Sequence, residues 1–421
     1  MFGKKIIKSI IRNEMKKNIK NLELNRKFFY PLAEPTYSES EVVNALNSMT
    51  SFSTTMWNKT KEFEKMFGEK YGGEAIMVNS GSSADLLISF AVSEKSGGPL
   101  PFGSEILVPS VTWPTHLWSL IMAGFKVKLI DVDPETLNFN LEDLKRNITK
   151  DTRGIFIVHL LGNMGDMQGL KEICTEKNLV LMEDCCEALG SKFADQPAGT
   201  FGLASSFSFF FSHHLVTMEG GMILTNDKEF AKKCRLLRAH GWEREINSSV
   251  SVSSGGIDER FKFVTWGFNV RPTEIQAGFG IEQIKKMDLF EAARNKNAEI
   301  LNDCILRNKK FLSTMKVREP VKCSWFAFPI IVKKNAPFLR SDIANFLDKN
   351  GVETRPIVAG NLAKQPAISH YPEISFNVLE GADLIHERGL YIGIHPTTEH
   401  NNLLRVVDLI DSFCEQWQPN E

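Results

Sequence analysis

Short apolar runs alternate along most of the chain with stretches in which apolar residues recur every three or four positions. The short runs have the length of strands, and they occupy residues 75–79, 105–109, 126–131, 154–159 and 179–182. The helical spacing predicts helices at residues 39–49, 60–71 and 84–93. Strands that alternate with helices predict an α/β fold with a mostly parallel central sheet. In such a sheet, ligands bind beyond the carboxyl ends of the strands.

The pattern changes in the last third of the chain. A long helix is expected from Ile281 to about Arg307, and it should link two domains. The elements expected after it are a strand at 325–332, a helix at 341–349, a strand at 352–358 and a helix at 401–416. We therefore predict a large domain at residues 29–290 and a smaller C-terminal α/β domain at residues 291–421.

The first 28 residues form a basic extension that precedes the large domain. This segment contains nine lysines and arginines but only two acidic residues, Glu14 and Glu23. Its apolar residues recur at three- and four-residue steps. This spacing predicts an amphipathic helix. Such a helix could bind a membrane surface or a partner. The interpretation that we favour is a helix lying on the surface of its own protein.

Composition narrows the class of protein. Fifty basic and fifty-one acidic residues give a net charge of −1, so no global field selects for nucleic acid or membrane. The seven cysteines show no Cys-x-x-Cys spacing, which argues against a zinc site and a disulfide framework and favours a reducing compartment. No apolar run approaches the ~18 residues of a membrane helix. We expect a cytoplasmic protein with no metal and no nucleic-acid partner.

Three polar or aromatic positions follow predicted strands. Ser80-Gly81-Ser82-Ser83 lies between a strand and a helix, where backbone N–H groups and the helix dipole can hold a phosphate. Trp113 follows the strand at 105–109 and could stack on a planar ligand, or be a core residue. Asp184 ends a central strand, where an unpaired carboxylate is costly to bury.

The segment Ser206–Met222 carries the most informative pattern. An apolar strand is followed by a polar turn with His213 and His214, and then by Glu219-Gly220-Gly221. No lysine occurs between Lys192 and Lys228. Histidine is a good proton carrier near neutral pH, and a short loop between rigid strands is a usual place for catalytic groups.

This segment resembles the fold-type I, pyridoxal-phosphate-dependent sugar aminotransferases of the DegT/DnrJ/EryC1/StrS family. In that family, a lysine that forms a Schiff base with the cofactor precedes an acidic-Gly-Gly element by six residues. Counting back six residues from Glu219 gives His213. The chain is therefore similar to the branch in which histidine replaces the lysine, the 3-dehydratases of 4-keto-6-deoxy sugars. The resemblance extends over roughly residues 29–410.

The resemblance implies pyridoxal 5′-phosphate or pyridoxamine 5′-phosphate as the cofactor. It implies two catalytic residues, His213 and Glu187, with Glu187 orienting or charging the imidazole and His214 lying behind it. The implied cofactor-binding residues are Ser82, Ser83, Trp113, Asp184, Glu187, Ser208 and, across a two-fold interface, Asn269. Candidate substrate contacts are Arg238, His240, Arg271 and Arg355, for which a surface role is the alternative.

The implied reaction is a glutamate-dependent loss of the C3 hydroxyl from a nucleotide-linked 4-keto-6-deoxyhexose, with GDP-4-keto-6-deoxy-D-mannose as the expected substrate. An imidazole cannot form the imine that a lysine forms, so the cofactor would be held non-covalently and deoxygenation would be favoured over amine transfer. The product would serve the synthesis of 3,6-dideoxysugars of lipopolysaccharide O-antigens. The resemblance also implies a homodimer with shared active sites.

Three alternatives compete with this interpretation. The first is an aminotransferase that makes a 4-amino sugar, and the second is a non-catalytic cofactor-binding regulator. The third is a dehydratase for CDP-linked sugars, which carries clustered cysteines for an iron–sulfur centre and works with a reductase. No cysteine lies between Cys234 and Cys304, so we expect no iron–sulfur reductase partner.

Overall fold

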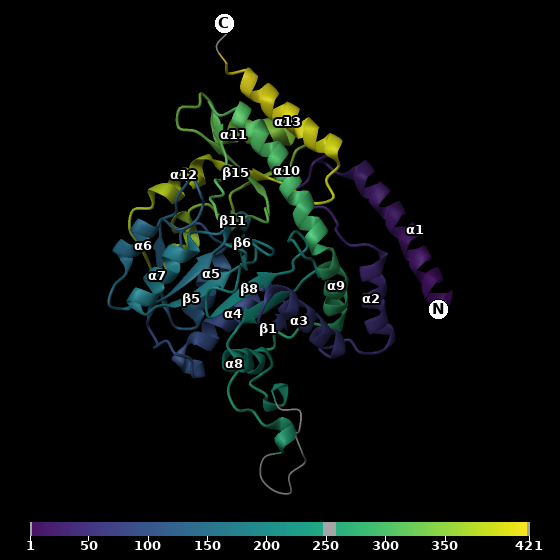
Figure 1. Cartoon of the computed structure of the whole chain (residues 1–421), viewed down its shortest axis with the longest axis vertical. Helices are drawn as coiled ribbons and strands as arrows, with labels where there is room; N and C mark the ends of the chain where they lie inside the picture. The colour runs from purple at the N-terminus through teal and green to yellow at the C-terminus, as the bar shows by residue number, and fades with distance from the viewer. Residues whose placement is uncertain (1, 247–257, 419–421) are drawn as a thin grey trace.

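The computed structural model describes residues 2–246 and 258–418, so the Ser/Gly-rich stretch 247–256, which the sequence suggests is a loop, lies outside the described residues. An eight-stranded sheet forms the centre of the molecule (Figure 1), in the order β1-β9-β8-β5-β4-β2-β3-β14. Its strands are β1 (Glu74–Val78), β2 (Glu105–Pro109), β3 (Lys126–Ile130), β4 (Thr152–Val158), β5 (Val180–Asp184), β8 (Ala204–Ser208), β9 (Gly221–Thr225) and β14 (Ile374–Phe376). Only β9 pairs antiparallel with its neighbours, β1 and β8. The predicted α/β class with a mostly parallel sheet is confirmed.

Both faces of the large sheet are covered by apolar residues. Along β1, Ile76 and Val78 join one buried cluster, whereas Ala75 and Met77 join the other. This alternation is the two-residue period of a strand that is buried on both sides. The helices of this part are α2 (Glu39–Thr50), α3 (Asn58–Tyr71), α4 (Gly81–Val92), α5 (Pro114–Met122), α6 (Leu141–Asn147), α7 (Met167–Lys177), α8 (Lys228–Arg238) and α9 (Glu274–Gln283).

A second, four-stranded sheet carries the C-terminal part, in the order β10-β12-β15-β13, and all its pairs are antiparallel. Its strands are β10 (Leu312–Ser313), β12 (Phe328–Val332), β13 (Thr354–Pro356) and β15 (Gly389–Ile392). The helices around it are α10 (Met287–Arg307), α11 (Arg340–Lys349), α12 (Glu380–Arg388) and α13 (His400–Glu415). A small third sheet joins β11 (Val321–Lys322), β6 (Lys192–Phe193) and β7 (Gln196–Pro197).

Two features of the chain differ from the expected layout. The long helix expected from Ile281 is divided, because α9 ends at Gln283 and a 3-10 turn at Ile284–Lys286 separates it from α10. The C-terminal part also contributes to the large sheet, because β14 pairs parallel with β3. The other 3-10 turns are Glu94–Ser96, Leu160–Gly162, Glu243–Glu245, Glu259–Phe261, Leu362–Lys364 and Pro366–His370.

The basic extension forms the predicted helix, α1 (Phe2–Asn25), at the outer edge of the molecule beside α2 (Figure 1). Arg12 pairs with Glu39 of α2, and Ile11 and Met15 are half-buried. On the outer side of α1, Ile10 is 62% exposed. The helix therefore touches its own protein along a narrow stripe. In the described part of the chain, every helix is too short or too polar to cross a bilayer.

Candidate active site

A cavity of about 530 Å³ lies at the carboxyl ends of β5 and β8 and is closed on one side by β13 and β15. It therefore sits between the large and the C-terminal sheets, at the strand ends where an α/β sheet binds ligands. Its lining residues, all within the described ranges, include no lysine. They are Ser80, Gly81, Ser82, Asp85, Trp113, Thr115, Val158, Leu160, Asp184, Cys186, Glu187, Ser208, Phe210, Ser212, His213, Glu219, Phe326, Arg355, Pro356, Val358 and Tyr391.

The start of α4 forms one end of the cavity. Ser80 is the N-cap residue, and its Oγ accepts a hydrogen bond from the Ser83 N–H at 3.1 Å. Gly81 allows α4 to approach β8 closely, since a Cβ at this position would lie 2.6 Å from the Cβ of Ser208. Among the described residues, no hydrogen-bond acceptor is recorded for the N–H groups of Gly81 and Ser82. These donors at a helix N-terminus fit a phosphate group.

The expected phosphate contacts do not all reach the cavity. Ser82 and Ser208 line it. Ser83 does not, because its N–H and hydroxyl both meet the Ser80 hydroxyl. Ser83 is therefore used in hydrogen bonds with the N-cap residue Ser80. Ser80, which the sequence analysis did not select, lines the cavity instead.

Two residues are placed to receive a flat, cationic ring. Trp113, at the start of α5, is 58% exposed and lines the cavity, so it is not a core residue. Asp184, at the end of β5, is 5% exposed, and its Oδ1 accepts the N–H of Cys186 at 2.9 Å. No lysine, arginine or histidine of the described chain forms an ion pair with Asp184. A protonated ring nitrogen would supply the missing partner.

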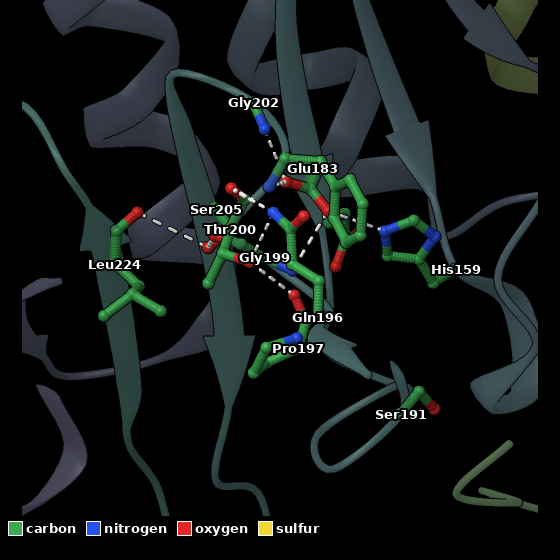
Figure 2. Close-up of polar contacts among 12 residues, drawn as sticks. His159, Glu183, Ser191, Gln196, Pro197, Gly199, Thr200, Gly202, Ser205 and Leu224 are labelled. Atoms are coloured by element: carbon green, nitrogen blue, oxygen red, sulfur yellow. Dashed lines mark hydrogen bonds and ion pairs between the residues drawn. The ribbon is translucent and has the colours of Figure 1, made fainter. Parts of the chain in front are cut away.

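The preceding residue, Glu183, has a different environment (Figure 2). Its two carboxylate oxygens accept the N–H groups of Gly199, Phe201 and Gly202 at 2.8–2.9 Å, and His159 Nε2 lies 2.9 Å away. The side chain is fully buried. Glu183 thus organises the loop between β7 and β8, in agreement with its omission from the expected site.

His213 lies on the turn that follows β8. The expected apolar strand extended to Phe211, but β8 ends at Ser208, and the His213 N–H donates to the Phe210 carbonyl at 2.9 Å. Phe209 still points into the core against Phe63 and Phe67, whereas Phe210 and Phe211 are 44% and 40% exposed. The early turn carries His213 into the cavity.

The environment of His213 keeps its imidazole neutral. Its ring meets the edge of Phe326, with centroids 5.1 Å apart. Burial, with a smaller contribution from the Arg294 guanidinium, lowers the pKa of His213 to about 4. A neutral imidazole can accept a proton at physiological pH. His214 is buried behind it, with Nε2 3.3 Å from the Ser324 carbonyl oxygen.

Glu187 lines the cavity but does not contact His213 in the expected way. Its Oε2 accepts the Leu161 N–H at 2.8 Å, and the described residues show no hydrogen bond between Glu187 and His213. Burial raises the pKa of Glu187 to about 7, and the nearby Asp184 adds to this rise. The carboxyl group therefore exchanges its proton near neutral pH.

The C-terminal sheet contributes a pair that closes the cavity. Arg355 on β13 lies opposite Tyr391 on β15, and both line the cavity. Arg355 also forms an ion pair with Glu353 at 2.7 Å. Burial raises the pKa of Tyr391 to about 12, with the charge of Glu187 as the next cause. Sequence analysis selected Arg355 but missed Tyr391, because a tyrosine within a strand carries no distinguishing pattern.

Four further expected residues lie outside the cavity lining. Arg238 is 4% exposed, and its Nη1 donates to Glu64 at 2.7 Å and to the Met77 carbonyl at 2.8 Å. Its guanidinium is thus bonded within the fold and does not line the cavity, and its expected sugar or diphosphate contact stays a prediction.

His240 and the pair Asn269 and Arg271 lie in the segments after α8. The His240 N–H donates to the Phe268 carbonyl at 2.7 Å. Asn269 is exposed, and its Oδ1 accepts a hydrogen bond from Arg271 Nε at 3.0 Å. An exposed Asn269 outside its own cavity is compatible with a contact to a neighbouring subunit.

Comparison with known proteins identifies close relatives. The sequence model of the DegT/DnrJ/EryC1/StrS aminotransferase family matches residues 35–411. The GDP-4-keto-6-deoxy-D-mannose 3-dehydratase of Escherichia coli O55:H7 (strain CB9615 / EPEC) is 38% identical over 372 residues, which cover 87% of this chain and 95% of that protein.

Solved structures agree with this match. The E coli GDP-4-keto-6-deoxy-D-mannose-3-dehydratase with bound hydrated PLP superimposes with a TM-score of 0.86 at 36% identity, covering 91% of this chain and 99% of that one. GDP-4-keto-6-deoxymannose-3-dehydratase with a trapped PLP-glutamate geminal diamine gives a TM-score of 0.85 at 36% identity, covering 90% and 100%. All of α1 precedes the residues that the family model matches.

Proposed function

The chain belongs to the DegT/DnrJ/EryC1/StrS aminotransferase family, and from this membership we propose that it is a 3-dehydratase rather than an aminotransferase. Its cofactor is pyridoxal or pyridoxamine 5′-phosphate, and its substrate is a nucleotide-linked 4-keto-6-deoxyhexose, first of all GDP-4-keto-6-deoxy-D-mannose. Loss of the C3 hydroxyl gives a 4-keto-3,6-dideoxy sugar. Glutamate restores the amine form of the cofactor, as the glutamate adduct of the related structure suggests.

The observation that carries this proposal is the position of His213. It lies in the cavity with Trp113 and Asp184, and no lysine is among the lining residues. A histidine can move protons but cannot hold the cofactor by a covalent bond. The amine of the cofactor therefore has no competing amine of the protein in this cavity.

The residues present fit the cofactor at both of its ends. The N–H groups at the start of α4 and the Ser208 hydroxyl suit its phosphate, and Asp184 suits its ring nitrogen. When bound, the cofactor supplies an amine for the sugar ketone and an electron-withdrawing ring. Trp113, which lines the cavity at the start of α5, would offer its indole to this ring.

The remaining residues act on protons and charge. The neutral imidazole of His213 accepts a proton and returns it within the cavity. The rings of Phe210 and Phe326 lie against this imidazole, with centroids 6.1 and 5.1 Å from it. Arg355 offers a cation at the wall formed by the C-terminal sheet, where it can bind a carboxylate of glutamate or a phosphate of the nucleotide.

The central experiment incubates the purified protein, pyridoxal phosphate and glutamate with a panel of nucleotide-linked 4-keto-6-deoxy sugars. We expect a product that has lost the C3 oxygen, together with free ammonia, and 2-oxoglutarate in equal amount. Nitrogen retained in the sugar would instead show an aminotransferase. His213→Gln should bind the cofactor but lose about 10²–10⁴-fold in rate.

Borohydride treatment provides an independent check of the histidine argument. We expect reduction of the cofactor-loaded protein to leave the polypeptide unmodified, because the cavity contains no lysine. The variant His213→Lys should become covalently labelled under the same conditions and serves as the positive control. Pyridoxyl attached to a lysine of the unaltered protein would refute the proposal.

We also propose a homodimer in which Asn269 reaches the cofactor phosphate of the neighbouring subunit. Support comes from its exposure and from its position outside the cavity of its own subunit. Heterodimers formed from Asn269→Ala and Asp184→Ala subunits test this arrangement, because one of their two sites would contain neither substitution. We expect an isolated heterodimer to have about half of the activity of the unaltered dimer, and an equal mixture after random subunit exchange to have about a quarter. Two equally inactive sites would contradict it.

A further inference from the structure

A second buried carboxyl group lies beside Asp184 at the floor of the cavity. Asp85 projects from the first turns of α4, one helical turn after Gly81, and is 3% exposed. Asp184 reaches the same floor from the end of β5 and is 5% exposed. Both side chains line the cavity. At Gly81, α4 approaches β8 so closely that a Cβ there would lie 2.6 Å from the Ser208 Cβ. The charge of Asp184 acts directly on Asp85.

The partners of the two groups are unequal. Asp184 accepts the Cys186 N–H at 2.9 Å and faces the place where a cationic ring would bind. The Oδ1 of Asp85 has no hydrogen-bond partner, although less than 1 Å² of it is accessible to solvent. Within the described chain, neither carboxyl group forms an ion pair with a lysine, arginine or histidine.

No group that faces Asp85 supplies a positive charge. Ser206 of β8 and the thiols of Cys185 and Cys186 are its neighbours besides Asp184. His116 of α5 lies on the side of Asp184, and its buried Nε2 also lacks a partner. Burial lowers the pKa of His116 to about 4, so this ring is neutral at physiological pH.

Two carboxylates that share a buried site cannot both be ionised without a cation for each. The bound ring nitrogen provides one cation, and Asp184 is the group that faces it. Burial, and then the charge of Asp184, raise the pKa of Asp85 well above its ordinary value. The Ser206 hydroxyl lowers this pKa, but its contribution is smaller than those of burial and Asp184. Burial, the unpartnered Oδ1 and the absence of a cation nearby among the described residues therefore favour the protonated form of Asp85.

We propose that Asp85 is a positioning residue that stands behind Asp184 as a protonated acid, so that the two carboxyl groups carry one negative charge between them. This inference rests on the proposed function, since it assigns Asp184 to the cofactor nitrogen. The neutral acid holds Asp184 toward the ring without adding a second charge. The protein thereby limits the negative charge beneath the ring to the single carboxylate that pairs with it.

Unfolding of the cofactor-free protein as a function of pH tests the protonation of Asp85. A carboxyl group whose pKa is raised in the folded state binds more protons folded than unfolded, so stability falls as pH rises above its unfolded pKa of about 4. The variant Asp85→Asn removes this fall. We expect its melting temperature to match that of the unaltered protein near pH 4 and to exceed it by a growing margin toward pH 8.

Control variants separate charge from packing. Asp143→Asn changes a buried carboxylate that accepts the Asp131 N–H at 2.9 Å, and it should destabilise the protein at neutral pH. A gap between Asp85→Asn and the unaltered protein that does not change with pH would overturn the proposal.

Cofactor binding tests the role of Asp85 toward Asp184. Titration with pyridoxal phosphate, followed by its absorption, should give Asp85→Asn an affinity within about threefold of the unaltered protein, because an amide also donates a hydrogen bond. Asp85→Leu should lose about tenfold, since it leaves Asp184 without this support. The pH midpoint of the absorption of the bound cofactor should be unchanged in Asp85→Asn.

The outcomes distinguish this inference from the proposed function. A midpoint that drops by about one unit or more in Asp85→Asn would show that Asp85 is ionised beside the ring, and would overturn the inference alone. Equal affinities of Asp85→Leu and the unaltered protein would also overturn it. If the unaltered protein itself binds no pyridoxal phosphate, the proposed function fails first.

Discussion

Glu183 and Asp184 are consecutive carboxylates at the end of β5, and they point to opposite sides of the large sheet. On one side, Glu183 is enclosed by three backbone N–H groups and His159, and all of its acceptor positions are used (Figure 2). On the other side, Asp184 accepts the Cys186 N–H, lies beside the Cys186 thiol and faces a cavity, and it has no cationic partner among the described residues. Both side chains are almost completely buried, with Glu183 0% and Asp184 5% exposed.

The difference shows how to separate a structural carboxylate from a binding one. A buried charge is tolerated when donors saturate it, and the fold of the chain supplies these donors to Glu183. Asp184 has been left short of partners, so a ligand must supply one. The unsatisfied group, rather than the buried group as such, marks the site.

The largest expected effect is the loss of activity on substitution of Asp184, the carboxylate that faces the cavity. Asp184→Asn removes the counter-charge of the ring nitrogen, and we expect kcat/KM to fall about 10³-fold while the unfolding midpoint of the cofactor-free protein is unchanged or raised. Steady-state kinetics and denaturant unfolding of the same preparation measure both. A loss of stability comparable to that of a Glu183 variant would erase the distinction between the two carboxylates.

Substitution of Glu183 should instead lower stability and leave catalysis unchanged. Glu183→Gln replaces one acceptor oxygen by an NH₂ group that faces backbone donors, and we expect it to lower the free energy of unfolding by about 3 kcal/mol. Urea unfolding measures this loss. Glu176→Gln, on the exposed face of α7, is the matched control and should change stability by less than about 0.5 kcal/mol. Folded Glu183→Gln protein should retain its activity per active site.

Glu187 should give a smaller, pH-dependent effect on the binding side. Its pKa of about 7 means that the carboxyl group loses its proton as pH rises through neutrality. The pKa of His213, about 4, keeps the imidazole neutral over this range, so it cannot produce the same change. If the ionised carboxylate is the active form, kcat/KM should rise roughly tenfold between pH 6 and 8, and this rise should be absent in Glu187→Gln. The same rise in Glu187→Gln would show that another group causes the pH dependence.

The smallest expected effect concerns the stability of the loop that binds Glu183. The Ser205 hydroxyl donates to the Gly199 carbonyl at 2.8 Å and supports the loop whose N–H groups bind Glu183 (Figure 2). Ser205→Ala should cost about 1 kcal/mol in unfolding free energy and leave the affinity for pyridoxal phosphate unchanged. A change in cofactor affinity without a change in stability would mean that the two sides of β5 are coupled.

Sequence reasoning reached most of the fold, because the strands of the large sheet are short apolar runs bounded by polar turns. It placed Trp113, Asp184, Ser208 and His213, which lie at the end of a strand or within five residues after it, so that their position along the chain fixes their position in space. It missed Tyr391, which enters the cavity only because β15 pairs with β13. Such a contact depends on the pairing of distant strands and leaves no local pattern.

Two errors have equally specific causes. Arg238 was selected from its neighbourhood in sequence, but the guanidinium turns inward to Glu64 and the Met77 carbonyl. The long helix expected from Ile281 is interrupted at Ile284–Lys286, where a helical apolar pattern continues although the backbone tightens. Neither a side-chain direction nor a local change of helix type can be read from apolar spacing.

The strand β14 has a consequence for how a bulky ligand reaches the cavity. This strand belongs to the C-terminal part, yet it forms the edge of the large sheet beside β3, and the Asp131 carboxylate holds the adjoining α12 through the N–H groups of Gly381 and Ala382. A hinge that swung the two halves apart would have to break these bonds. We therefore expect the large and the C-terminal parts to keep their relative positions when a ligand binds. Access to the cavity would then depend on movements of the side chains around its opening.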